Sequence, residues 1–293
     1  MFGFQDQVAD NAGLFAARKS DGTYIAIGWR VKHAGFVILI LSLMSAAHAQ
    51  QSKSKAPDRT APTGDCSTKW ETVKPDIEYR TIRCIGDPEK VDLHLVRVDP
   101  RKWKLDTLVK GSGTYAKTVA RDKDAPFAVN TNFFDKARRP LGIIVRSGEI
   151  VQKPRSTSWQ SIFLVSKSGR PRIVLPDKWN QHRSTAWMAV QAGPRLVSEG
   201  HTVKLKPNYS APRVGVCIQW DRDLIFFATP ATQKFHVTEM AKIARRKEDQ
   251  GGLACRDAML FDGGHSVNFF VGGEEQVSIT GDPVPVYIYA TED

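Results

Sequence analysis

The stretch 258–270, AMLFDGGHSVNFF, constrains the fold of this chain more than any other. It predicts a short buried strand, followed by an acid, two glycines and a second apolar run. Because an unpaired carboxylate is costly to bury, Asp262 is expected to be either well hydrogen-bonded or functional. Gly263 and Gly264 permit a turn with positive φ and a close approach of a ligand to the backbone. The alternative is an ordinary hairpin turn, since Asp-Gly is a strong hairpin signal.

Alternation of apolar and polar residues predicts a chain built mainly from β-strands. The predicted strands are 77–83, 91–98, 104–109, 127–130, 141–146, 149–151, 160–165, 172–175, 213–220, 224–229, 267–271, 276–279 and 284–289, with one more running into Asp262. Two helices are predicted over 114–124 and 237–247, the second with Thr238 as its candidate N-cap. We therefore expect an α+β fold with a mixed, largely antiparallel β-sheet core and a few packed helices.

The N-terminal region carries the pattern of a secretory signal. Arg30 and Lys32 precede an apolar run, 35–44, that is too short to span a bilayer comfortably. Ala47-His48-Ala49 then matches the small-x-small pattern of a cleavage site. The alternative is an uncleaved signal anchor.

We expect the chain to consist of three regions. Residues 1–49 are predicted to be an upstream extension and the signal, and 50–65 a flexible linker. Residues 66–293 are predicted to form the folded domain. The protein is then expected to be exported, to the periplasm or outside the cell, with no stable membrane span after cleavage.

Four cysteines remain after the signal, and an exported protein commonly pairs them. Three pairings are possible. Cys66–Cys84 is preferred because these two cysteines bracket one local segment, and Cys217–Cys255 is the second choice. No Cys or His spacing resembles a zinc site. The sequence indicates no cofactor and leaves a divalent cation open.

The net charge of +11 favours an anionic partner. The basic residues are scattered, without a long Lys/Arg run or a nucleic-acid-binding signature, so nucleic-acid recognition is not predicted. A glycan or a sugar phosphate fits this charge better.

Two further places join polar groups to strand ends. Residues 130–135, NTNFFD, follow a predicted strand and combine amides, an acid and two aromatic rings. The alternative there is an Asn/Asp turn with core aromatics. Arg213 stands directly before an apolar strand and could reach a cleft at the sheet edge; the alternative is an exposed strand-end arginine.

Five motifs in one order resemble those of the phosphodiester glycosidase family, and the resemblance covers about Cys84 to the C-terminus. The motifs are AVNTNFFD at 128–135, PLGIIVRSGEI at 140–150, QAGPRLV at 191–197, RVGVCI at 213–218 and FDGGHSVNFF at 261–270. This chain departs from the family pattern at Thr131 and Asn132, where glycines are common, and at His265, where a small residue is usual. These departures narrow the expected pocket.

The resemblance implies an exported hydrolase that cleaves the bond between an anomeric carbon and a phosphate. Asp262 or Asp135 would act as base or nucleophile, Arg213 would bind the phosphate, and His265 would supply a proton. The positions implied to bind substrate are Asn130, Asn132, Gly263, Gly264, Ser266 and Asn268.

Two other functions remain open from the sequence. Residues 264–268, GHSVN, nearly match the nucleophile elbow of serine hydrolases, but a strand rather than a helix is predicted to follow Ser266. The protein could also be a non-catalytic envelope or exopolysaccharide protein that binds glycans or serves in their biosynthesis, because a fold does not determine a function.

Overall fold

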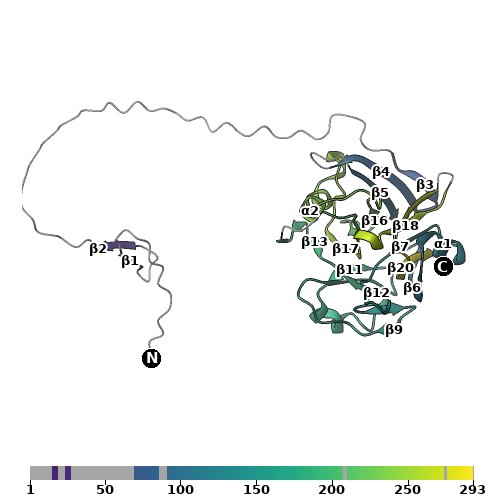
Figure 1. Ribbon diagram of the computed structural model, residues 1–293, viewed down its shortest axis with the longest axis horizontal. Coiled ribbons are helices and arrows are strands. Elements are labelled where there is room, and N and C mark those ends of the chain that lie inside the picture. The colour runs from purple at the N-terminus through teal and green to yellow at the C-terminus, as the bar shows by residue number, and fades with distance from the viewer. Residues whose placement is uncertain are drawn as a thin grey trace, which may run out of the picture. The chain divides into compact units, whose positions relative to one another are not determined.

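The computed structural model describes residues 15–18, 24–27, 69–85, 91–206, 210–273 and 276–292 (Figure 1). The chain forms two units, Met1–Ala56 and Pro57–Asp293. In the first, β1 (Phe15–Arg18) pairs antiparallel with β2 (Tyr24–Ile27). The predicted signal, the predicted linker and Cys66 lie outside the described residues. Within the described residues, no helix is long and apolar enough to cross a membrane.

The largest sheet has eight strands in the order β14-β13-β17-β15-β16-β5-β4-β3. Its strands are β3 (Glu71–Lys74), β4 (Ile77–Ile85), β5 (Val91–Val98), β13 (Arg195–Ser198), β14 (His201–Thr202), β15 (Val214–Ile218), β16 (Leu224–Ala228) and β17 (Asp257–Leu260). All residues of β15, β16 and β17 are buried, which explains their nearly continuous apolar sequence.

Two five-stranded sheets complete the domain. The first runs β19-β18-β7-β20-β6, with β6 (Lys104–Thr114), β7 (Phe127–Asn130), β18 (Asn268–Val271), β19 (Val277–Thr280) and β20 (Val284–Thr291). The second runs β11-β10-β12-β8-β9, with β8 (Ile144–Arg146), β9 (Glu149–Gln152), β10 (Ser161–Ser166), β11 (Pro171–Val174) and β12 (Ala186–Ala192).

The inner faces of the three sheets enclose one hydrophobic core. Phe226 of β16 contacts Phe127 of β7 and Phe163 of β10, with ring centroids 5.4 and 6.0 Å apart. Because burying one such ring contributes roughly 2–3 kcal/mol, these contacts between sheets are a major source of cohesion.

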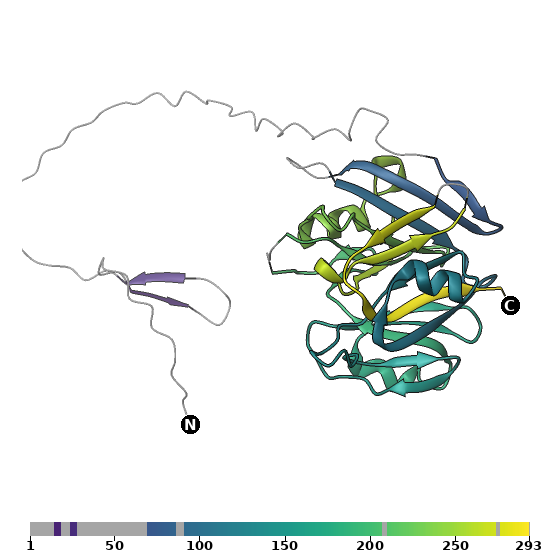
Figure 2. The same ribbon diagram turned by 45° about the vertical axis from the view of Figure 1, so that its right-hand side comes forward.

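Helices cover the outer faces of the sheets (Figures 1 and 2). The helix α2 (Val237–Arg245) packs on the eight-stranded sheet and α1 (Ala116–Asp122) on β7, β18 and β20. The 3₁₀ helix η1 (Pro176–Gln181) covers the third sheet through Trp179. Two further 3₁₀ turns are η2 (Glu248–Gln250) and η3 (Gly264–Ser266). The i, i+3, i+4 spacing of apolar residues that predicts α2 is the spacing of its buried side.

Most predicted strands are present, but β3, β12, β13 and β14 were not predicted. Three further features differ. The core is not mixed, because every pair among the described strands is antiparallel. Parallel pairing needs long crossovers, usually helical, and the described α-helices are few. Helix α1 begins at Ala116 because Thr114 pairs with Val284 at the end of β6. Helix α2 has His236, not Thr238, at its N-cap.

Cys217 of β15 is bonded to Cys255, just before β17. This is the second-choice pairing of the sequence; Cys66–Cys84 stays a prediction, since Cys66 is outside the described residues.

The Cys217–Cys255 bond closes a loop with a sequence separation of 38 residues. Replacing both cysteines by alanine is expected to lower the free energy of unfolding by about 3–4 kcal/mol, mainly by freeing the unfolded chain. Equilibrium urea unfolding measures this, and a double variant as stable as the parent would contradict it.

Candidate active site

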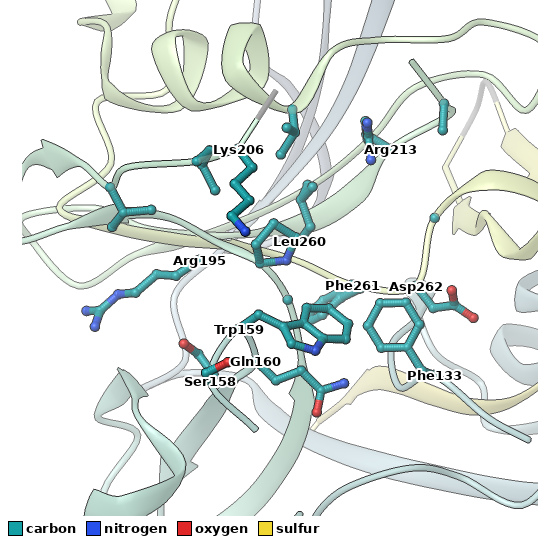
Figure 3. A pocket seen from close by; sticks show the side chains of 18 of the residues that line it. Phe133, Ser158, Trp159, Gln160, Arg195, Lys206, Arg213, Leu260, Phe261 and Asp262 are labelled. Atoms are coloured by element: carbon teal, nitrogen blue, oxygen red, sulfur yellow. The ribbon is translucent and has the colours of Figure 1, made fainter. Parts of the chain in front are cut away.

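A cavity of about 800 Å³ lies where β17 ends and its neighbours begin (Figure 3). Both β13 and β15 run antiparallel to β17. The residues just before these two strands therefore meet the residues just after β17 at one edge of the sheet. This brings Arg213 and Asp262 to the same cavity, although they are 49 positions apart in the sequence.

Asp262 is half-buried at the edge of this cavity. Burial raises its pKa to about 7, and a hydrogen bond from Ser266 lowers the pKa by a smaller amount. The backbone of Asp262 is fixed on both sides: its N–H donates to Thr131 O (2.8 Å), and its carbonyl accepts from Asn130 Nδ2 (2.7 Å). A fixed carboxyl group that titrates near neutral pH can take or give a proton during catalysis.

The two positions after Asp262 require glycine for different structural reasons. At Gly263, a Cβ would lie 2.6 Å from Pro212 O, so the turn packs against the backbone before Arg213. Gly264 has φ +63°, a left-handed conformation that glycine adopts without strain. The Gly264 N–H donates to Pro212 O (2.9 Å) and is therefore not available to bind a ligand. Both glycines line the cavity.

Arg213 is buried, with 6% of its surface exposed, and it bonds two residues of the segment between β16 and α2. Its N–H donates to Thr229 Oγ1 (2.9 Å), and its Nε donates to Phe235 O (2.8 Å). These bonds hold the guanidinium at the cavity wall, in the part of the view above Asp262 (Figure 3). A buried cation at a cavity wall can bind an anionic group of a ligand.

The side-chain amides of the three asparagines predicted to bind substrate form hydrogen bonds with backbone groups, and none of these residues lines the cavity. Asn130 bridges the turn, since its Oδ1 accepts from Asn268 N (2.8 Å) while its Nδ2 bonds Asp262 O. Asn268 Nδ2 donates to Ser266 O (3.2 Å) and Asp282 O (2.8 Å). Asn132 Nδ2 donates to Ile143 O (3.1 Å). In this arrangement they shape the Asp262 turn.

Asp135 and His265 lie outside the residues that line the cavity. The Asp135 carboxylate accepts from the N–H groups of Ala137 and Arg139 (2.9 Å each) and from Arg139 Nε (2.8 Å). These bonds lower the pKa of Asp135, the backbone bond of Arg139 most of all. His265 is exposed, and its carbonyl accepts from Asp282 N (2.6 Å). The structure thus brings neither residue to the lining of the cavity.

The turn at Gly264–Ser266 is followed by a strand, β18, rather than by a helix. A nucleophile elbow needs a strand, a sharp turn and then a helix. Ser266 therefore lacks the setting of a serine-hydrolase nucleophile.

An aromatic wall of Phe133 and Trp159 borders the cavity beside Asp262 (Figure 3). Phe133 belongs to the NTNFFD motif, whereas Trp159 was not predicted. Trp159, with 51% of its surface exposed, meets Phe133 edge to face at 5.3 Å between ring centroids. Gln191 bonds Arg155 N and O (2.9 and 2.6 Å) and so ties the Trp159 loop to β12. At Gly193, a Cβ would lie 2.7 Å from Trp159 O, so this glycine permits the loop to pack closely.

Three more cations line the cavity and were also missed. Arg195 is paired with Asp257 (2.6 Å), whereas Lys204 and Lys206 are exposed and make no ion pair within the described part of the chain. Their only sequence signal is the alternation Lys204-Leu205-Lys206 in a loop. Within the same described ranges, no group of three His, Cys, Asp or Glu side chains could hold a metal ion.

Residues 123–291 match the phosphodiester glycosidase family. The match spans more than half of the 293 residues, and the chain belongs to this family. No curated protein matches the sequence.

Two solved structures have a similar fold. One is the catalytic domain of zebrafish N-acetylglucosamine-1-phosphodiester alpha-N-acetylglucosaminidase, auto-inhibited by its pro-peptide, with a TM-score of 0.62, 16% identity, and coverage of 78% of this chain and 88% of that chain. The other is a hypothetical protein from Synechocystis, with a TM-score of 0.55, 14% identity, and coverage of 77% and 64%. At these identities the likeness concerns the fold.

Proposed function

We propose that this protein is a hydrolase that cleaves the glycosidic bond of a sugar-1-phosphodiester. The observation that carries the proposal is the carboxyl group of Asp262, which titrates near pH 7 in a cavity that also holds Arg213. Membership of the phosphodiester glycosidase family supports the same reaction class.

In the proposed reaction, Asp262 is the general base. Water forms a bond to the anomeric carbon while the bond from this carbon to the phosphate oxygen breaks. The electron pair of the broken bond leaves with the phosphate, and Asp262 takes the proton from the attacking water. The products are the free sugar and a phosphate monoester. Phosphate is a good leaving group, so the reaction needs orientation and charge stabilisation more than a second acid.

Arg213 is proposed to bind the phosphate. A guanidinium donates to two phosphate oxygens at once, which fixes the leaving group while its negative charge grows. The bond from Arg213 Nε to Phe235 O supports this role, because it orients the guanidinium before the substrate arrives.

The aromatic wall is proposed to bind the sugar. Trp159 has 51% of its surface exposed and meets Phe133 edge to face, and in Figure 3 Phe133 lies between Trp159 and Asp262. Stacking a sugar ring there would place its anomeric carbon near the carboxyl group. A ring with half of its surface exposed can gain contact area on binding without unfolding its neighbours.

Incubation with a panel of sugar-1-phosphodiesters tests the proposed reaction, with released sugar and released phosphate monoester both measured. One or more diesters should be cleaved to equal amounts of both products. The assay is run with and without EDTA, which decides whether a divalent cation assists. Binding of the diesters without any product would instead support the glycan-binding alternative.

Replacing Trp159 by alanine is expected to raise KM about tenfold and to change kcat less than threefold, because the sugar loses its stacking surface. Trp220→Ala is the matched control, since Trp220 is also exposed (66%) and does not line the cavity. Steady-state kinetics on both variants measures the difference. Equal KM values for the two variants would contradict the proposal that Trp159 binds the sugar.

We further propose that the protein is exported. The signal pattern at 30–49 and the Cys217–Cys255 bond support export, since disulfides persist in oxidising compartments. Mass spectrometry of the N-terminus after expression of the full chain is expected to find Gln50 as the first residue. A retained N-terminus would contradict cleavage at this site.

A further inference from the structure

The charges that line the cavity exceed what one phosphodiester needs. The lining includes four cations, Arg195, Lys204, Lys206 and Arg213, and one carboxyl group, Asp262. A phosphodiester carries one negative charge. If Arg213 binds that charge, as proposed above, the other three cations need a separate explanation.

One of these three already has an ion-pair partner within the protein, although that partner, Asp257, also pairs with Arg256 (2.8 Å). Arg195 Nη2 lies 2.6 Å from Asp257 Oδ1, and Arg195 Nε donates to Val197 O (3.3 Å). In Figure 3 its guanidinium points away from Lys206 and from the aromatic wall. Arg195 therefore links β13 to β17, and its guanidinium is directed away from Lys206.

The two lysines have no such partner among the described residues. Neither makes an ion pair within the described ranges, and the next three residues in the sequence, 207–209, are Pro, Asn and Tyr, which carry no acid. Two ammonium groups so close in sequence repel each other, and an anion between them relieves this repulsion.

The lysine segment is held in place at the cavity. Val203 N donates to Leu196 O (3.0 Å), and Leu205 packs against the core beneath α2. In Figure 3 the Lys206 side chain points into the cavity from the side opposite Trp159 and Phe133. The aromatic wall and Lys206 thus border different sides of the cavity, with Asp262 at the aromatic side. Lys204 also lines this cavity.

We propose that Lys204 and Lys206 bind a second anionic group of the substrate, carried by the aglycone beyond the scissile phosphate. This inference rests on the proposed function, because it takes the sugar on the aromatic side and the diester phosphate at Arg213. The preferred substrate is then a sugar-1-phosphodiester whose aglycone bears a phosphate or a carboxylate. A diester with a neutral aglycone leaves both lysines unused.

Binding of non-hydrolysable phosphonate analogues tests the inference without turnover. Three analogues share the sugar and differ in the aglycone, which is glycerol, glycerol phosphate or glycerate. Calorimetry is expected to give about tenfold tighter binding for one or both anionic analogues than for the glycerol analogue. The glycerol phosphate and glycerate arms decide between phosphate and carboxylate. Raising the salt concentration should weaken the anionic analogues more than the neutral one.

The double variant Lys204→Gln/Lys206→Gln should lose this preference and keep its affinity for the glycerol analogue within twofold. Lys110→Gln is the control, since Lys110 is exposed and does not line the cavity. Equal affinities of the parent protein for all three analogues, or a preference that survives the double variant, would overturn the inference. Binding with the expected preference, but no hydrolysis of the corresponding diesters, would contradict the proposed function alone.

Discussion

Asp262→Asn is expected to lower kcat on a sugar-1-phosphodiester by at least a hundredfold. The amide is nearly isosteric with the carboxyl group but cannot take a proton from water, so the variant loses the general base. The backbone bonds that fix this position, to Thr131 and Asn130, do not involve the side chain and should persist. Asp135→Asn is the control, because that carboxylate does not line the cavity, and it should retain activity within a few-fold. An Asp262→Asn variant with parental turnover would exclude the role of base.

Although Asp262→Asn should lower kcat, it should raise the free energy of unfolding at pH values above about 7. Asp ionises near pH 4 in the unfolded chain, whereas Asp262 ionises near pH 7 in the folded protein. Between these values the folded state binds one more proton than the unfolded state, so stability falls as pH rises through this window. The variant has no such loss. At pH 8 it should therefore exceed the parent by about 2–4 kcal/mol, and below pH 4 the two should agree.

Urea unfolding of both proteins at pH 3.5 and pH 8 measures this difference. A turn-forming role for the Asp262 side chain predicts the reverse sign at pH 8, because the variant would lose a favourable hydrogen bond worth about 1 kcal/mol. The activity of the parent supplies a second test. Its kcat/KM should rise as pH increases through about 7, since the base must be ionised in the free enzyme.

Arg213→Lys is expected to lower kcat/KM for a sugar-1-phosphodiester by ten- to a hundredfold. Lysine keeps the positive charge but loses the planar fork and the Nε–H that donates to Phe235 O. The loss should depend on the leaving group. An aryl glycoside of the same sugar has no phosphate, so its hydrolysis should fall less than threefold.

The comparison between these two substrates separates binding of phosphate from a structural role. Equal losses on both would mean that Arg213 supports the cavity wall rather than the leaving group. Thermal unfolding of the variant should accompany the kinetics, because the side chain is buried and its replacement leaves Phe235 O without this donor.

The strands and the Asp262 turn could be predicted because their signals are local. Alternating residues predict β5, and a buried strand followed by Asp-Gly-Gly predicts the turn after β17. The short strand β14 was missed, since two exposed residues carry no periodic signal. Helix α1 was predicted two residues early because β6 extends to Thr114 through its pairing with β20. Pairing of distant strands overrides a local boundary.

The composition of the cavity was harder to predict than the Asp262 turn. Residues such as Asn130 stand in a polar motif, yet their amides bond the backbone, and only the folded chain shows this. Trp159 and Lys206 stand in loops without a motif and reach the cavity because Gln191 and the Val203–Leu196 bond hold those loops. A sequence pattern identifies residues that shape a site more readily than residues that loops bring to it.

The antiparallel arrangement at the end of β17 has a consequence for how this protein can diversify. Asp262 and Arg213 are spaced by the ladder between β15 and β17, which is part of the buried sheet. The tryptophan and the two lysines lie on separate loops with few constraints from that ladder. Exchanging either loop could therefore redirect the choice of sugar or aglycone while the reacting groups keep their spacing. Libraries that randomise 156–159 and, separately, positions 204 and 206 would offer an engineer two independent specificity controls, while Leu205 keeps its contact with the core.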